Sequence, residues 1–219
     1  KADMFRYLED KFGVTLVENE DYSIYNNTSS IIRVIDRLED TYLCSSDNYF
    51  PSNVFIEKVK DSYYSALYAE GQTNEYCLSE DTDGNIMAVT AGGHDSWYML
   101  GHVFFSKEFS EKFRTIMTEE YQDEKTRLGY WEDVYIRHIA ELPPMKIRKY
   151  RPHEIEEFDS LAELRAFAPK YLNDTGSRIL RNICSVLSCE EKDIEDITVL
   201  KNGMTNSSFR FTCKKNGRK

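Results

Sequence analysis

Three features of the 219-residue sequence predict a three-layer α/β fold with a mixed sheet. Segments with helical periodicity alternate with short apolar runs, which is typical of a sheet covered by helices. Apolar residues make up 41% of the chain and aromatic residues 13%, enough for a core and unlike a disordered chain. The turn signal Asp83-Gly84 lies between two β-type runs and predicts an antiparallel hairpin.

Helices and strands are expected to alternate at the start of the chain. Residues 3–12 share an apolar face at helical spacing, and residues 14–17 form a short β-type run. A second helix is expected to begin at the N-cap candidate Thr28 and to carry apolar residues up to Leu38. Residues 41–44 then predict a buried strand.

The middle of the chain predicts a strand-rich region that is followed by helices. A strand at residues 62–69 precedes the hairpin. The other elements expected here are hairpin strands at 75–78 and 86–89, a strand at 97–105, helices at 107–122 and from Trp131, and an edge strand at 145–150. Ser160 and Glu163 predict a capping box at the start of a helix that reaches Phe167.

A polar connector at residues 173–176 predicts a boundary between two domains, 1–172 and 177–219. The elements expected in the second domain are a helix at 177–188 and strands at 197–200 and 208–213. Because the sequence opens on Lys1 with residues typical of a helix interior, we expect a fragment of a longer polypeptide that lacks its first strands.

The composition argues against several classes of partner. The net charge is 28 − 38 = −10, whereas a nucleic-acid surface needs clustered Lys and Arg. The five cysteines include no C-x-x-C pair, so neither a disulfide framework nor a zinc site is expected. No apolar run approaches the ~20 residues of a membrane span, and no signal peptide is seen. We therefore expect a cytoplasmic protein that binds neither nucleic acid nor membranes.

Six short motifs occur together in a fixed order. They are Tyr25-Asn26-Asn27, Ser46-Asp47-Asn48-Tyr49, Asn74-Glu75-Tyr76, Gly101-His102-Val103-Phe104-Phe105, Tyr130-Trp131-Glu132-Asp133 and Glu157-Phe158-Asp159-Ser160. In order and spacing they resemble the bacterial CTP:phosphocholine cytidylyltransferases, which belong to the sugar-nucleotidyltransferase superfamily and have a Rossmann-like fold. The resemblance implies transfer of CMP from CTP to phosphocholine, giving CDP-choline and pyrophosphate. The family's Gly-rich CTP loop is not in this sequence, so the resemblance covers the acceptor-binding portion. The family often has Trp at Tyr76 and Asp at Glu132.

The resemblance implies that Asp47 and Glu132 are catalytic and bind Mg²⁺, the expected cofactor. Mg²⁺ prefers hard oxygen ligands, and Asp47 follows an apolar strand at the edge of the sheet where α/β proteins bind ligands. A turn residue at Asp47, and a helix-dipole role for Glu132, are the structural alternatives. Asp133 is the alternative candidate for the role of Glu132. Adjacent residues of a helix point in different directions, so only one of the two should face the site.

The resemblance also implies a pocket for choline. A quaternary ammonium is held by aromatic faces and a nearby carboxylate. The aromatic candidates are Tyr76 and Tyr130, with Trp97 and Trp131 as further choices, and the carboxylate candidates are Glu75 and Glu157. Asn27 either lies beside the substrate or shapes the loop ahead of a helix.

The tail resembles the nucleotide-covering hairpin at the start of choline kinases, in residues 200–209. This resemblance implies a bifunctional protein whose second domain begins as an α+β kinase-like N-lobe and binds nucleotide through Gly203, Thr205 and Asn206. Two alternatives stay open, namely a sugar-1-phosphate nucleotidyltransferase and a non-catalytic fragment. The sequence also leaves open whether the protein forms a homodimer.

Overall fold

The structure is a computed structural model that describes residues 2–158, 160–167, 178–190, 193–202 and 207–214. It divides into two compact units, Lys1–Glu157 and Phe158–Lys219. The expected boundary at residues 173–176 lies outside the described residues, so the division into domains 1–172 and 177–219 stays a prediction.

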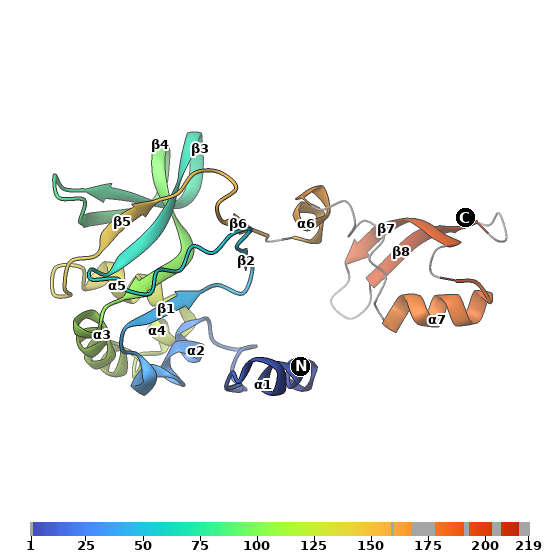
Figure 1. The fold of residues 1–219 in the computed structure, drawn as a ribbon, viewed down its shortest axis with the longest axis horizontal. Helices are drawn as coiled ribbons and strands as arrows, with labels where there is room; N and C mark the ends of the chain where they lie inside the picture. The colour runs from blue at the N-terminus through green and yellow to red at the C-terminus, as the bar shows by residue number, and fades with distance from the viewer. Residues whose placement is uncertain (1, 159, 168–177, 191–192, 203–206, 215–219) are drawn as a thin grey trace. The chain divides into compact units, whose positions relative to one another are not determined.

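A four-stranded mixed sheet forms the centre of the first unit (Figure 1). Its strands, in spatial order, are β1 (Thr41–Cys44), β4 (Ile86–Phe105), β3 (Tyr63–Glu80) and β5 (Lys146–Lys149). β5 runs parallel to β3, whereas the other pairs are antiparallel. The mixed α/β sheet and the edge position of β5 are confirmed. A separate pair joins β2 (Asn48–Tyr49) to β6 (Glu156–Glu157).

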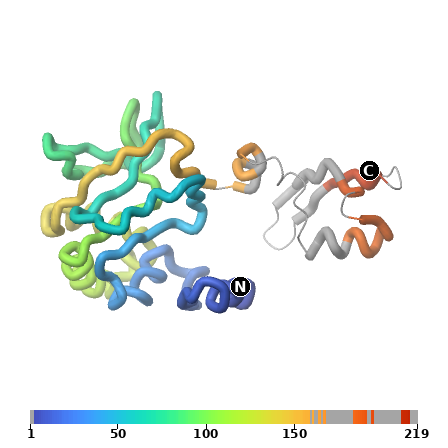
Figure 2. The backbone as a smooth tube through the Cα atoms, viewed as in Figure 1, coloured from blue at the N-terminus to red at the C-terminus, as the bar shows by residue number. Residues whose placement is uncertain are grey.

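The hairpin predicted at Asp83-Gly84 is confirmed, and it is longer than the sequence indicates. The expected strands at 62–69 and 75–78 are parts of β3, and those at 86–89 and 97–105 are parts of β4. Figure 2 shows the path of both strands, which stay paired across several irregularities in register. Gly84 turns the chain with φ of 80°, a backbone angle that glycine adopts without steric cost.

Helices cover one face of the sheet (Figure 1). In the first unit the helices are η1 (Ala2–Met4), α1 (Tyr7–Phe12), α2 (Thr28–Ile32), η2 (Ile35–Arg37), α3 (Lys107–Glu120), α4 (Glu124–Leu128) and α5 (Trp131–Arg137). The helices predicted at 107–122 and from Trp131 are confirmed as α3 and α5. Ser106 caps α3 by accepting a hydrogen bond from the Phe109 N–H at 3.3 Å.

Three expectations for the first part of the chain are wrong. Residues 14–17 form no strand, and Val14 and Val17 stay exposed because no partner strand pairs with them. The helix expected from Thr28 to Leu38 breaks into α2 and η2, in a stretch of β-branched residues that favour helix weakly. Thr28 is also not an N-cap. Its hydroxyl instead donates to main-chain carbonyls before α5, including that of Arg127 at 3.0 Å.

Alternate residues of the strands face two different layers, as the period of a β-strand requires. Tyr64 and Ala66 pack with α3 and α5 in the main core. Leu67 and Leu100 belong to a smaller cluster on residues 50–54 and 150–155. The sheet is therefore buried on both faces, with helices on one side and loop segments on the other.

The second unit contains helices α6 (Leu161–Phe167) and α7 (Arg178–Leu187) and the antiparallel strands β7 (Ile194–Asn202) and β8 (Ser207–Cys213). The capping box of α6 is confirmed, since the Glu163 N–H donates to Ser160 Oγ and the Ser160 N–H donates to Glu163 Oε2. Gly203, Thr205 and Asn206 lie outside the described residues. In the part of the chain that is described, no helix is long and apolar enough to cross a membrane.

Candidate active site

The turn before α2 holds the first residues of α5 in place. The side chain of Asn27 accepts a hydrogen bond from the Trp131 N–H at 2.8 Å through Oδ1. Its Nδ2 donates to Glu132 Oε2 at 3.2 Å. Both ends of the amide are therefore engaged within the protein, and Asn27 positions the start of α5. Its predicted place beside the substrate stays a prediction.

Glu132 is a partly buried residue whose carboxylate is held by hydrogen bonds from protein groups. Its second oxygen, Oε1, accepts a hydrogen bond at 3.1 Å from the hydroxyl of Tyr64, which is 2% exposed. The Tyr64 ring stacks on Trp131 with centroids 5.8 Å apart. Burial raises the pKa of Glu132, and the hydrogen bonds from Asn27 and Tyr64 partly oppose that rise. Glu132 thus lies in an internal polar network, and its role as a metal ligand stays a prediction.

Asp133 connects the two tyrosines that the sequence predicts for the ammonium pocket. Its Oδ1 accepts from the Tyr76 hydroxyl at 3.1 Å, and its Oδ2 accepts from the Tyr130 N–H at 2.9 Å. Burial raises the pKa of Tyr76, with a further contribution from this carboxylate. The ring of Tyr130 is about half exposed. Asp133 therefore links the Tyr76 hydroxyl to the Tyr130 main chain, and it shares no hydrogen-bond partner with Glu132.

Three glutamates, Glu75 on β3 and Glu156 and Glu157 on β6, add negative charge near Tyr98. Burial raises the pKa of Tyr98, and the charges of Glu157, Glu75 and Glu156 raise it further. The pKa of Tyr64 is raised by burial and then by Glu132 and Glu157. A ligand in this region would meet phenol groups flanked by carboxylates, an environment that favours a cation.

The two tryptophans contribute differently from the tyrosines. Trp131 is 5% exposed and packs in the core against Phe105 as well as Tyr64. Trp97 contacts Tyr68 at 5.3 Å, and the Lys149 ammonium lies 5.2 Å from its ring centre. Both rings have structural partners already, so Tyr76 and Tyr130 are the stronger candidates for contact with a ligand.

Asp47 lies in the turn between β1 and β2 with oxygen atoms that suit a hard cation. Its buried Oδ1 has no hydrogen-bond partner among the described residues, and neither has Oδ1 of Asn48. Asn48 also pairs with Glu157 across β2 and β6. Mg²⁺ usually takes one or two carboxylates together with substrate phosphates, and this oxygen set fits that requirement. Among the described residues no group of three His, Cys, Asp or Glu side chains is placed to hold a metal ion.

Tyr64 and the positioning role of Asn27 were not predicted from the sequence. In the sequence, Tyr64 is one of several aromatic or apolar residues in a predicted strand. No local signal identifies its hydroxyl as a partner of Glu132. The carboxylate and its amide partner are 105 residues apart. Such pairs become visible only when the fold brings α5 against β3 and the turn before α2.

Comparison with known proteins identifies the class first. No family model matches the chain. The solved CTP:phosphocholine cytidylyltransferase from Streptococcus pneumoniae superposes with a TM-score of 0.72 at 27% identity, over 77% of this chain and 74% of that one. The mixed sheet and this likeness therefore define a Rossmann-like nucleotidyltransferase.

Two curated relatives then define the family. A 2-aminoethylphosphonate cytidylyltransferase from Lancefieldella rimae is 33% identical over 174 residues, which cover 78% of this chain and 70% of the relative. A choline-phosphate cytidylyltransferase from Streptococcus pneumoniae is 28% identical over 163 residues, covering 74% and 71%. The chain belongs to this cytidylyltransferase family.

Proposed function

We propose that the chain acts in CTP-dependent transfer of CMP to phosphocholine, releasing pyrophosphate. The observation that carries the proposal is that Asp133 accepts from the Tyr76 hydroxyl and from the Tyr130 main chain, so that two aromatic residues and a carboxylate lie close together and could receive an ammonium group. Family membership supports the nucleotide half of the reaction. An aromatic and acidic pocket suits phosphocholine better than a sugar phosphate, whose hydroxyls need several hydrogen-bonding partners.

2-Aminoethylphosphonate is the second candidate acceptor. The relative from Lancefieldella rimae carries that name and is 33% identical. Tyr76 also adds a reason, because its phenol oxygen can accept a hydrogen bond from a primary ammonium, whereas the trimethylammonium of choline has no N–H to donate. Turnover of the two acceptors therefore compares a primary with a quaternary ammonium in the same pocket.

The reaction leaves little covalent chemistry to the protein. A phosphate or phosphonate oxygen of the acceptor forms a bond to the α-phosphorus of CTP, and the bond from that phosphorus to pyrophosphate breaks. Tyr76, Tyr130 and Asp133 would orient the acceptor, and the Asn27–Glu132 network would keep the start of α5 in place. Mg²⁺ would be held by Asp47 and Asn48, where it supplies positive charge beside the phosphates.

The test is to mix the chain with CTP, Mg²⁺ and either phosphocholine or 2-aminoethylphosphonate and to measure the pyrophosphate released. We expect Asp47→Asn to lower kcat by at least about 100-fold, because a charged ligand is lost beside the phosphates. Tyr76→Phe should raise KM for the acceptor several-fold while KM for CTP stays the same. Tyr68→Phe, on the same strand but packed on Trp97, is the matched control. No turnover with either acceptor, but turnover with a sugar 1-phosphate, would contradict the proposal.

We also propose that residues 177–219 are the start of a choline kinase-like domain. The support is the sequence resemblance around Gly203, Thr205 and Asn206, together with the antiparallel pair β7 and β8 that flanks them. Binding of ATP to the chain, measured by calorimetry in wild type and in Gly203→Val, tests this part. Equal ATP binding in both proteins, or none in wild type, would contradict it.

A further inference from the structure

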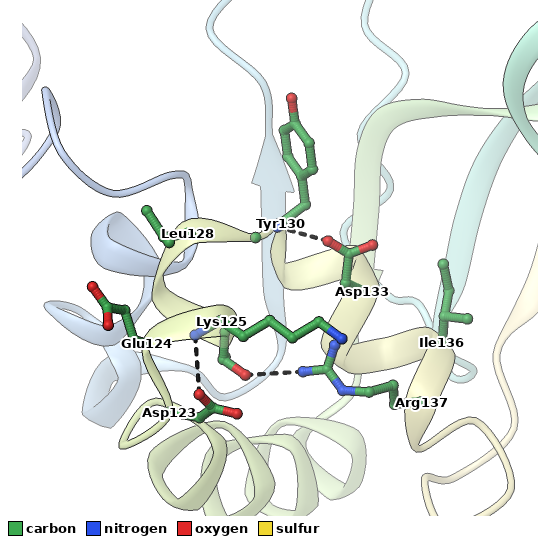
Figure 3. A pocket seen from close by; sticks show the side chains of 10 residues that line it. Asp123, Glu124, Lys125, Leu128, Tyr130, Asp133, Ile136 and Arg137 are labelled. Carbon is green, nitrogen blue, oxygen red and sulfur yellow. Dashed lines mark hydrogen bonds between the residues drawn. The ribbon is translucent and has the colours of Figure 1, made fainter.

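A cavity of about 780 Å³ opens between α4 and α5 (Figure 3). Tyr130, Asp133, Ile136 and Arg137 line it from α5 and the residue before, and Lys125 and Leu128 line it from α4. Asp133, Ile136 and Arg137 are spaced to share one face of α5. The volume lies in the range of about 300–1,000 Å³ that is usual for small-molecule sites.

Arg137 is held in one orientation at this cavity. Its Nη2 donates to Glu120 Oε2 and, at 3.1 Å, to Thr126 Oγ1, and Thr126 is 4% exposed. Burial raises the pKa of Glu120, but hydrogen bonds from Arg137, His138 and Thr126 outweigh it and lower that pKa to about 2. Glu120 therefore stays ionised near neutral pH, and Arg137 remains anchored through one nitrogen. Its other N–H groups stay available to a ligand.

Lys125 supplies a second cation at the same cavity. Its ammonium makes no ion pair or hydrogen bond with any residue that the structure describes. In Figure 3 its side chain extends across the cavity toward Arg137, while Glu124 points the other way. Glu120 neutralises Arg137, so the charge of Lys125 is left for a ligand.

Two carboxylates at the rim, Asp123 and Asp133, accept hydrogen bonds from groups other than the Lys125 ammonium. Asp123 caps α4 by accepting from the Lys125 N–H at 3.0 Å. Asp133 accepts from the Tyr130 N–H and from the Tyr76 hydroxyl. Neither carboxylate pairs with the Lys125 ammonium. Two cations that project into one cavity, one of them without a counter-ion, are a typical arrangement for binding a phosphate group.

We propose that this cavity binds the phosphate group of a small molecule through Lys125 and Arg137. Resting on the proposed function, the candidate ligands are the acceptor phosphate and the pyrophosphate part of the nucleotide. Tyr130 and Asp133 line the cavity and also belong to the candidate active site. A ligand bound here therefore contacts the residues that orient the acceptor.

Binding of inorganic phosphate, measured by calorimetry at constant ionic strength, tests the proposal without any turnover. We expect Lys125→Met to weaken phosphate binding at least fivefold. Lys112→Met is the matched control, because Lys112 lines a second cavity among Glu108, Glu111 and Glu141. Equal binding by wild type and Lys125→Met, or no binding by wild type, would overturn the proposal.

Competition identifies the source of the phosphate. Displacement of bound phosphate by phosphocholine supports an acceptor subsite, and displacement by pyrophosphate alone supports a nucleotide subsite. Displacement by neither compound would overturn the assignment to a ligand of the reaction. A chain that binds phosphate through Lys125 but transfers no CMP contradicts only the proposed function. If the wild-type chain transfers CMP but binds phosphate no more tightly than Lys125→Met, only this inference is contradicted.

Discussion

Removing the hydroxyl of Tyr64 should destabilise the first unit, because it leaves the Glu132 carboxylate oxygen Oε1 without its protein donor. Tyr64 is 2% exposed, and its hydroxyl lies 3.1 Å from Glu132 Oε1. Hydrogen bonds to charged groups contribute about 1.5–3 kcal/mol, so Tyr64→Phe should lower the free energy of unfolding by about 2 kcal/mol. That loss changes the equilibrium constant of unfolding roughly 30-fold.

Urea unfolding followed by tryptophan fluorescence measures this loss. The two tryptophans, Trp97 and Trp131, lie in the first unit, so the signal reports that unit. With a slope of about 2 kcal/mol per molar urea, the midpoint should fall by about 1 M. Tyr135→Phe is the matched control, because the Tyr135 hydroxyl is buried and has no hydrogen-bond partner in the described chain. Its removal should shift the midpoint by less than about 0.3 M.

The pH dependence separates a bond to a charged group from a purely steric effect. The raised pKa of Glu132 means that its stabilising contribution is complete below the unfolded pKa and is lost as pH rises through the folded pKa. The Tyr64 hydroxyl opposes that loss by stabilising the ionised form. The cost of Tyr64→Phe should therefore be larger at pH 7 than at pH 4. An equal cost at both pH values, or an equal cost in Tyr135→Phe, would refute the reasoning.

Three further predictions concern other parts of the chain. His102 is fully buried, and burial with the charge of Arg148 lowers its pKa to about 4, so stability should fall by about 3 kcal/mol as pH drops from about 6.5 to 4. His102→Phe should remove most of that slope in urea unfolding. A Cβ on Gly101 would lie 2.9 Å from Ser45 Cβ, so Gly101→Ala should cost roughly 1–3 kcal/mol in urea unfolding, and adding Ser45→Gly should recover part of it. Ser160→Ala removes the α6 cap and should cost about 1 kcal/mol, seen as faster amide exchange across the helix.

The elements that were predicted correctly are those with strong local signals. The Asp83-Gly84 turn predicts its hairpin because the turn needs a positive φ, which Gly84 adopts. The period of α3 and the alternation of β5 are similarly local. Residues 14–17 have the composition of a strand, but a strand also needs a partner, and composition carries no information about partners.

The candidate site shows the same division between local and long-range information. The family resemblance carried by the ordered motifs led to Tyr76, Tyr130 and Glu157, and the structure links the Tyr76 hydroxyl and the Tyr130 main chain to one carboxylate, Asp133. Choosing between Glu132 and Asp133 required contacts with the turn before α2 and with β3, which are distant in sequence. The metal and substrate roles themselves stay predictions.

The negative charges of the site require positive charge beside the substrate phosphates, and the tyrosines cannot supply it. Glu75, Glu157 and Asp133 suit an ammonium group but repel the phosphates that the reaction must bring together. At an effective dielectric constant of 20, two like charges 4 Å apart repel by about 4 kcal/mol. A zwitterionic acceptor resolves this conflict only when its phosphate lies against positive charge while its ammonium lies against carboxylate. Under the proposed function, Lys125 would supply positive charge at the cavity between α4 and α5, and a cation at Asp47 would supply it beside the phosphates. Under the proposed function, this separation of charge within the site would select an ammonium phosphate over a simple phosphate ester.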